Sequence, residues 1–386
     1  MARSPLFSRR IHITGSIDPD AAIATAEAVD KARELVGQLV RELLRRGATF
    51  VIPVDAEKLR DADQRPLCFD WLVWQAIDHH LHLRPADAVG PLAIAVQHRK
   101  SEGQIPKELT GLWDKLRATD LVQIENAAHW NMNSKRMEVQ AQSGDILITL
   151  GGDEGALFLA NLYHDAGKPV IPLPDALCKE RAGSRRLFDL GLTSSAAPRL
   201  FKPTSQTAHT WVNRLNAPRA STAERISTVI SLLEALEPPP AFAVRLMDDA
   251  NSDCRLVDDQ FEGVVKPIVE GELGYSLTVV DGRQGYDRPR IDQEIFAKLQ
   301  RSRLVLADLT GERPNCFLEA GFAMGRQLPT VIMCKKGGAT HFDLKTVATH
   351  FWDPSATLDA RKRALREHLE AVRSRPPLVP SEPLIS

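Results

Sequence analysis

The stretch Leu304-Val-Leu-Ala-Asp308-Leu-Thr-Gly311-Glu-Arg-Pro314-Asn-Cys-Phe-Leu-Glu319-Ala-Gly-Phe-Ala-Met-Gly325 decides the fold of the region around it. Its first residues form a continuous apolar run, which is typical of a strand buried in a parallel sheet. Thr310-Gly311 predicts a turn, and Pro314 suits the first turn of a helix, where an N–H would have no partner. Asp308 therefore ends a strand, at the edge where open α/β sheets bind ligands. Glu319 follows about one and a half helical turns into the helix, so geometry allows it to face the same crevice.

The alternation of strand and helix continues on both sides of this stretch. Strands are expected at 241–246, 276–280, 304–309 and 330–334, and helices at 259–270, 291–300, 314–325 and 358–374. This order predicts a flavodoxin-like parallel α/β domain over 241–375. Before it, Glu237-Pro238-Pro239-Pro240 stops any helix and stiffens the chain.

The first half of the chain repeats the same order of elements. Strands are expected at 10–15, 49–54, 92–97, 145–150 and 168–172, with helices at 25–46, 67–83 and 156–166 between them. This predicts a Rossmann-like doubly wound α/β domain over 9–175. Residues 176–240 offer one convincing helix, at 221–236, and are interpreted as a partly helical linker.

Two small-residue loops follow strands of the first domain, Thr14-Gly15-Ser16 and Gly151-Gly152-Asp153-Glu154-Gly155. Glycine lets the backbone approach a ligand closely, and amides at a helix N-terminus favour phosphate. The candidate residues for binding a nucleotide signal are Gly15, Ser16, Gly151, Gly152, Glu154 and Gly155.

Composition excludes several classes of partner. The 49 basic and 50 acidic residues nearly cancel, so no overall field draws the chain to nucleic acid or to an anionic membrane. No apolar run is long enough for a membrane span, and we expect a cytoplasmic protein. The five cysteines are scattered without a C-x-x-C pair, and His79, His80 and His82 have no acidic or cysteine partner at ligand spacing, so no metal site is expected.

The motif A-D-L-T-G-x-R-P-N followed by E-x-G-x-A resembles the nucleoside 2-deoxyribosyltransferase-like branch of the TIR-like enzymes. The resemblance extends back through Arg290-Ile-Asp292 and forward through His341-Phe-Asp-Leu-Lys. It implies that Glu319 is catalytic and that Asp308 assists. Near the helix N-terminus, Arg313 and Asn315 are candidates for contact with a phosphate or ribose, and Arg290 and Asp292 are further candidates for substrate contact.

The chemistry agrees with these roles. Cleavage of a C1′–N bond builds positive charge on the sugar, which a carboxylate stabilises. A neutral base needs a proton as it leaves, whereas the nicotinamide of NAD is already cationic and needs none. Glu319 alone therefore suffices for an NAD glycohydrolase, and Asp308 matters more for a deoxyribosyltransferase.

The glycine loop and the GKPVIP segment after it resemble the SLOG family of Rossmann-like nucleotide-binding domains. The enzymatic branch of that family carries P-G-G-x-G-T-x-x-E, but here Leu150 replaces the proline, Ala156 replaces the threonine and the loop is one residue longer. This departure favours sensing over hydrolysis by the first domain. SLOG domains joined to TIR-like or sirtuin-like NADases occur in bacterial antiviral systems, where they bind nucleotide-derived signals.

These resemblances imply a signal-activated antiviral effector that hydrolyses NAD to nicotinamide and ADP-ribose, without a further cofactor, and that works as a homo-oligomer. One alternative is a nucleoside 2-deoxyribosyltransferase or nucleotide N-glycosidase. Another, from a different class, is a non-catalytic nucleotide-binding adaptor in which Glu319 is structural.

Overall fold

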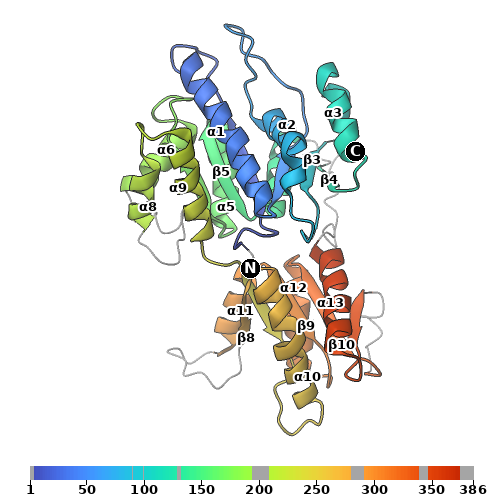
Figure 1. The fold of residues 1–386 in the computed structure, drawn as a ribbon. Coiled ribbons are helices and arrows are strands. Elements are labelled where there is room, and N and C mark those ends of the chain that lie inside the picture. Colours follow the sequence, from blue (N-terminus) through green and yellow to red (C-terminus); the bar gives the residue numbers. More distant parts are fainter. Residues whose placement is uncertain are drawn as a thin grey trace. The chain divides into compact units, whose positions relative to one another are not determined.

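The computed structural model describes residues 4–88, 90–98, 100–127, 132–193, 208–279, 291–338 and 347–373. The chain divides into two compact units, one ending at Glu237 and the other beginning at Pro238. Figure 1 colours the first unit from blue to olive and the second from gold to red. The division falls inside the proline-rich segment noted above.

The first unit is built on one parallel sheet with strand order β4-β3-β2-β1-β5-β6. Its strands are β1 (Arg10–Ser16), β2 (Thr49–Pro53), β3 (Ala93–Gln97), β4 (Val122–Asn126), β5 (Ile146–Gly151) and β6 (Val170–Leu173). Strand order reverses between β1 and β5, which pair in register with Gly15 opposite Leu150 and Ser16 opposite Gly151. A doubly wound sheet with this reversal is Rossmann-like, which confirms the predicted fold class.

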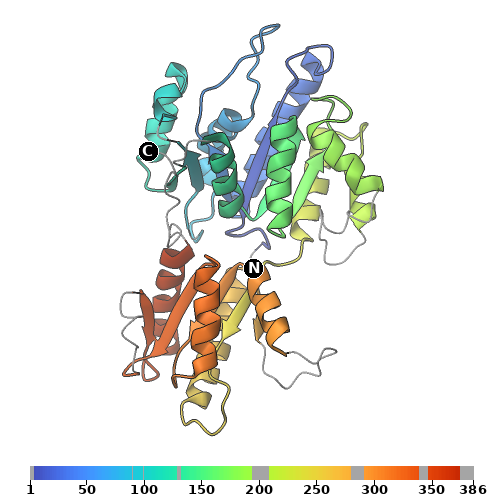
Figure 2. The same ribbon diagram turned by 180° about the vertical axis from the view of Figure 1, so that it is seen from behind.

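Helices cover both faces of this sheet. They are α1 (Ala26–Arg45), α2 (Asp70–His80), α3 (Lys107–Arg117), α4 (Met132–Ser143), α5 (Glu154–Asp165), α6 (Gly183–Thr193), α8 (Ala208–Leu215) and α9 (Thr222–Glu234). Helices α1 and α2 lie over the face turned toward the viewer in Figure 1. Figure 2, from behind, brings α4 and α5 forward.

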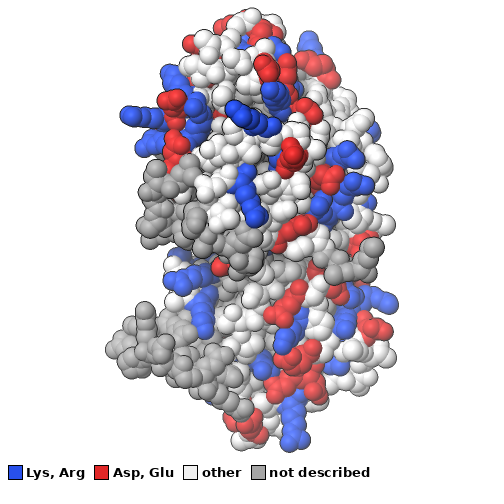
Figure 3. All heavy atoms as spheres, turned by 60° about the vertical axis from the view of Figure 1, so that its left-hand side comes forward, with Lys and Arg blue, Asp and Glu red and all other residues white. Residues whose placement is uncertain are grey.

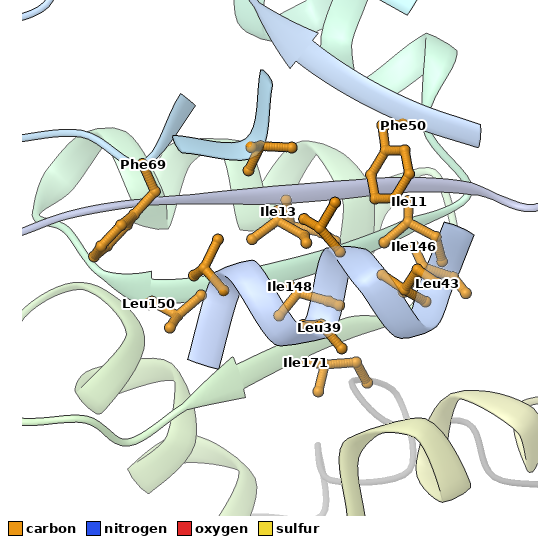
Figure 4. Packing of buried hydrophobic residues seen from close by; sticks show 14 of the residues in the cluster. Ile11, Ile13, Leu39, Leu43, Phe50, Phe69, Ile146, Ile148, Leu150 and Ile171 are labelled. Atoms are coloured by element: carbon orange, nitrogen blue, oxygen red, sulfur yellow. The ribbon is translucent and has the colours of Figure 1, made fainter. Parts of the chain in front are cut away.

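The core of the first unit lies between α1 and the central strands. Ile11 and Ile13 of β1 and Ile146 and Ile148 of β5 pack beside the apolar stripe of α1 (Figure 4). The members of that stripe recur in the sequence at the three- and four-residue spacing of one helix face, and all are buried: Val29, Ala32, Leu35, Val36, Leu39, Val40 and Leu43. Burial of each large aliphatic side chain contributes about 1.5–3 kcal/mol, so this interface fixes the central strands.

The first unit differs from the sequence expectation in two regions. The elements α3, β4 and α4 occupy residues 107–143, for which no elements were assigned. In addition, α6, α8 and α9 lie in the segment interpreted as a linker, yet α6 packs on β5 and β6, and α9 packs on α1. The apolar face of α9, with Ile226, Val229 and Leu233 buried, explains why this segment joins the first unit.

The second unit has a parallel sheet with strand order β11-β10-β9-β7-β8. Its strands are β7 (Pro240–Val244), β8 (Ser276–Val279), β9 (Leu304–Asp308), β10 (Thr330–Lys335) and β11 (Thr349–Trp352). This is the flavodoxin-like order, with its reversal between β7 and β9, so the predicted fold class is confirmed here too. Strand β11 was not predicted, because it is four residues long and the apolar Phe351 is exposed while the polar His350 is buried.

The helices of the second unit are α10 (Cys254–Gln260), α11 (Ile291–Arg301), α12 (Pro314–Gly325) and α13 (Leu358–Arg373). In Figure 1, α10 and α13 lie in front of the sheet, and α12 comes forward in Figure 2. After α10 the chain continues in two π-helical segments, Phe261–Val265 and Pro267–Glu272. Pro267 has no N–H to donate to an α-helical ladder, which accounts for part of the departure from the expected helix at 259–270.

The surface carries both signs of charge side by side. Over the face shown in Figure 3, Lys and Arg alternate with Asp and Glu without a large patch of one sign. Within the part of the chain that the structure describes, no helix combines the length and apolarity needed to cross a membrane.

The long connection between β2 and α2 is anchored by a buried arginine. Arg60 is 1% exposed and donates to the carbonyl oxygen of Ala24 at 2.7 Å. It also binds the carboxylate of Asp63 through two nitrogens. These bonds fasten the connection to the chain entering α1.

Replacement of this arginine is expected to destabilise the first unit. Arg60→Met keeps the aliphatic stem but leaves the buried Ala24 carbonyl unpaired, so the free energy of unfolding should fall by roughly 1–3 kcal/mol. Lys58→Met, which removes an exposed cation from the same connection, is the matched control and should change little. Chemical denaturation measures both; equal effects of the two substitutions would contradict the anchoring role.

Candidate active site

Asp308 ends β9 at the point where strand order reverses in the second unit. Asp308 is completely buried, with 0% of its surface exposed. One carboxyl oxygen accepts a hydrogen bond from the backbone N–H of Thr310 at 2.9 Å, and the other accepts from the indole N–H of Trp352 at 2.7 Å. Burial raises the pKa of Asp308, while these two donors act in the opposite direction. The carboxyl group is thus enclosed and holds the loop after β9 against the end of β11.

The rest of this loop is equally well fixed. The Thr310 hydroxyl accepts from the backbone N–H of Lys335 at 2.9 Å. Gly311 has a φ of +82°, and a Cβ there would lie 3.0 Å from the Leu246 side chain and 3.1 Å from that of Asn251. Only glycine suits this conformation and closeness. The loops that follow β7 and β9 therefore pack directly on each other.

Glu319 lies on the second turn of α12 and is partly exposed. Burial raises its pKa, and the positive charge of Arg313 opposes that shift. Cys316, one helical turn earlier, is buried, and burial together with the charges of Glu319 and Asp308 raises the pKa of its thiol to about 12. Both carboxylates are therefore within electrostatic reach of one side chain, although no hydrogen bond joins them among the described residues.

The other sequence candidates of this unit have different positions. Arg313 precedes α12 and is half-buried, and Asn315 is exposed in the first turn. Arg290 lies outside the described residues. Asp292 is in α11, but its side chain lies outside the described part. The structure thus places Arg313 directly before the helix that carries Glu319.

Sequence reasoning did not single out two cationic residues at the same edge of the sheet, Arg245 and Lys335. Arg245 directly follows β7 and pairs with Asp258, and its guanidinium lies 5.4 Å from the Phe261 ring. Lys335 ends β10 and pairs with Asp253. Their positions after strand ends, like that of Asp308, were the available signal. Cationic side chains here suit an anionic substrate.

In the first unit, the two glycine loops meet at the reversal between β1 and β5. A Cβ on Gly15 would lie 1.8 Å from the Leu150 carbonyl oxygen, and one on Gly151 would lie 2.2 Å from that of Ser16. The Gly152 N–H donates to the Ser16 carbonyl at 2.7 Å. The backbones are so close that side chains are excluded at these positions.

The helix after the second glycine loop begins at Glu154. Asp153, Glu154 and Gly155 are exposed, and Asp153 makes no side-chain capping bond. The first backbone N–H groups of α5 therefore remain open to an anion. The structure thus brings the six candidate residues for signal binding to one edge of the sheet.

Metal ligation has no support in the described residues, where no group of three or more His, Cys, Asp and Glu side chains is placed to hold an ion. His79, His80 and His82 lie at the end of α2 and in the turn after it, where His79 and His80 stack edge to face.

Comparison with known proteins identifies the first unit. The family model described as "ATP nucleosidase Cap17-like, N-terminal" matches residues 6–233, more than half of the chain. No curated protein matches. A solved structure, that of TM1055 from a structural genomics consortium, is 14% identical with a TM-score of 0.29, covering 47% of this chain and 81% of that one.

The buried bond to Asp308 makes a testable contribution to stability. Trp352→Phe leaves a buried carboxyl oxygen without its donor, so the free energy of unfolding should fall by about 1–3 kcal/mol. The pKa of Asp308 is higher in the folded than in the unfolded chain, so its ionisation costs stability as pH rises through the folded pKa. Loss of the indole donor raises that pKa further. The deficit should therefore be larger at neutral than at acidic pH.

Calorimetric unfolding at about pH 5 and about pH 8 measures this difference. Trp113→Phe is the control, because the Trp113 indole N–H has no partner among the described residues. A deficit that does not depend on pH would mean that the Trp352 indole does not support the ionised Asp308.

Proposed function

We propose, on the premise that this chain belongs to the Cap17-like ATP nucleosidase family by its N-terminal region, that it cleaves the N-glycosidic bond of a nucleotide in its second unit. The substrate that the site suits best is NAD, which would yield nicotinamide and ADP-ribose. Residues 238–380 lie outside the family match, so the assignment of catalysis to this unit rests on its own residues.

The proposal depends on the position and partial burial of Glu319. Glu319 is a partly buried carboxylate on α12, the helix that follows the strand at the sheet reversal. Ligands of open α/β sheets bind at that edge. A carboxylate set in a partly desolvated position stabilises the cationic sugar of the transition state more strongly than one in water.

The state of Asp308 supports NAD over a substrate with a neutral base. A purine or pyrimidine needs a proton as it leaves, and the group expected to assist is Asp308. Its carboxyl group is enclosed, and both oxygens already accept hydrogen bonds. It is poorly placed to pass a proton to substrate. The pyridinium of NAD needs no such donor, so one carboxylate is sufficient.

ATP is a second candidate, favoured by the name of the matching family. The cations Arg245 and Lys335 at the sheet edge suit the phosphates of either nucleotide. Hydrolysis of ATP to adenine would require a proton donor other than Asp308. The released base, nicotinamide from NAD or adenine from ATP, therefore distinguishes the two substrates directly.

The first unit would act as the sensor of this effector. Its open α5 amides and close glycine loops suit the phosphates of a nucleotide signal. Binding would favour the active form of the protein only if the signal binds that form more tightly. An oligomer and a role in antiviral defence belong to this proposal through the resemblance to SLOG–TIR fusions.

Removal of the Glu319 charge tests the assignment. Full-length protein is incubated with NAD, ATP or a deoxynucleoside, with and without a panel of nucleotide signals, and free bases are separated by chromatography. Glu319→Gln should reduce nicotinamide release on the order of 10²–10³-fold. Glu367→Gln, an exposed glutamate of α13, should retain activity.

Three results would contradict parts of the proposal. Adenine release from ATP that survives Glu319→Gln would move catalysis away from this residue. Adenine release that requires Glu319 would make ATP the substrate. Nucleotide binding without any base release would leave an adaptor.

The pH profile gives an independent prediction. Glu319 must be ionised to stabilise a cationic sugar, and burial raises its pKa above that of an ordinary glutamate. The kcat/KM for NAD should therefore fall as pH decreases, with a midpoint above about 4.3, the usual value for glutamate. A profile that stays flat down to the pH of unfolding would show that the essential group is not this carboxylate.

A further inference from the structure

A second group of polar residues lies at the carboxyl edge of the first unit, beside the glycine loops. Asp55 follows β2, Asp70 is the first residue of α2, and Arg136 lies on α4. Arg136 forms an ion pair with Asp55. None of these three residues was singled out from the sequence, and none has a role in the function proposed above.

Backbone hydrogen bonds connect this group to the glycine loops. The Gly152 N–H donates to the Ser16 carbonyl at 2.7 Å, and the next residue, Ile17, donates its N–H to the Leu67 carbonyl at 2.9 Å. Leu67 is three residues before Asp70. The Trp71 indole N–H donates to the Asp55 carbonyl at 2.9 Å. Asp55 and Asp70 are thus held next to the end of β1.

Helix α4 approaches the glycine loop from the other side. A Cβ on Gly155 would lie 3.4 Å from the terminal methyl group of Met137. Arg136, the residue before Met137, therefore lies on the part of α4 that adjoins the first turn of α5. The α5 amides and the Asp55–Arg136 pair therefore lie at the same edge of the sheet, with α4 adjoining both.

Two enclosed atoms of the group have unused hydrogen-bonding capacity. The Oδ1 atom of Asp70 and the Nε atom of Arg136 are buried, and neither has a hydrogen-bond partner among the described residues. A buried polar atom without a partner costs about 1–3 kcal/mol, and buried polar groups are normally paired. Asp70 as a residue keeps some exposure although its Oδ1 atom is enclosed, so the group lies close below the surface of this edge.

The two carboxyl groups differ in their charge. Burial and then the charges of Asp55 and Glu57 raise the pKa of Asp70 to about 7, although Arg136 opposes this. For Asp55, burial also favours a higher pKa, but the bound Arg136 outweighs it and the pKa is lowered. Carboxyl groups with pKa values driven apart are typical of functional sites. Near neutral pH, Asp70 is therefore present in both its protonated and its ionised form, and in this it differs from Asp55.

We infer that Asp70 recognises the adenine edge of a nucleotide whose phosphates bind the first turn of α5. A protonated carboxyl group donates from its O–H and accepts at its other oxygen. Adenine presents the matching pair, N1 as acceptor and the N6 amino group as donor. An ionised carboxylate has no donor for N1, but it accepts well from the N1–H and N2 amino groups of guanine. The inference rests on the nucleotide-binding part of the proposed function and not on Glu319.

The test compares ADP and GDP, whose diphosphates titrate alike, by calorimetric binding to the full-length protein. Between about pH 7 and pH 8.5 the affinity for ADP should fall roughly tenfold, as Asp70 loses its proton, while that for GDP should not fall. Asp70→Asn keeps one donor and one acceptor at every pH, as amides do toward adenine. Its ratio of ADP to GDP affinity should therefore not change with pH.

Asp61→Asn, an exposed aspartate of the β2–α2 connection, is the matched control and should behave as wild type. The other charged groups around Asp70 are Asp55, Glu57 and Arg136, with Lys58 near Cys68 and His98 near Asp55. All remain in both Asp70→Asn and the control. A dependence on pH that persists in Asp70→Asn would therefore assign it to one of these groups and overturn the inference.

Hydrogen exchange distinguishes a failure of the inference about Asp70 from a failure of the proposed nucleotide binding by the first unit. ADP or GDP should protect the amides of residues 153–155. Protection with a ratio of affinities that is constant with pH in wild type would overturn only the role of Asp70. No protection by either nucleotide would remove nucleotide binding by the first unit, and the inference with it. The wild-type series needs no variant, so a folding defect in Asp70→Asn does not prevent a decision.

Discussion

Both sheets reverse their strand order beside their first strand, and at each reversal a glycine lets the backbone pass close to a neighbouring segment. In the first unit, a Cβ on Gly15 or Gly151 would overlap a carbonyl oxygen at the end of the neighbouring strand. In the second, Gly311 has a positive φ and lies against Leu246 and Asn251. Glycine costs stability in regular structure. Here it allows two strand ends to meet closely, and the candidate residues of both units lie beside such a meeting point.

The two carboxylates of the sequence motif, Asp308 and Glu319, differ in how deeply they are buried. Asp308 comes at the end of a strand whose residues are all buried, and it is enclosed with two donors. Glu319 lies on a helix with one face toward solvent, so it keeps partial exposure. One enclosed and one accessible carboxylate suit a reaction in which a single charge faces the sugar. They suit less well a reaction in which the second acid must reach the leaving base.

The sequence alone predicted an element correctly where its hydrophobic period was clear or where a marked residue began or ended it. Helix α12 has the predicted bounds because Pro314 begins it and the strand before it is uniformly apolar. The buried stripe of α1 also follows from spacing alone. By contrast, β4 is only partly buried, and α4 has a weakly periodic, polar sequence, so neither gives a clear signal. The group around Asp70 could not be predicted, since it depends on how the connection after β2 folds back on β1.

Asp308 and Asp70 illustrate how the same residue type acquires different roles at equivalent edges of two sheets. Burial raises the pKa of both carboxyl groups. Asp308 receives two hydrogen bonds from the protein, so its desolvation is offset from within and it fixes a loop. The Oδ1 atom of Asp70 receives none from the described residues, so its desolvation is left for a ligand to offset. A buried carboxyl group is informative about function when its donors are missing, and on this criterion Asp70, more than Asp308, is positioned for recognition.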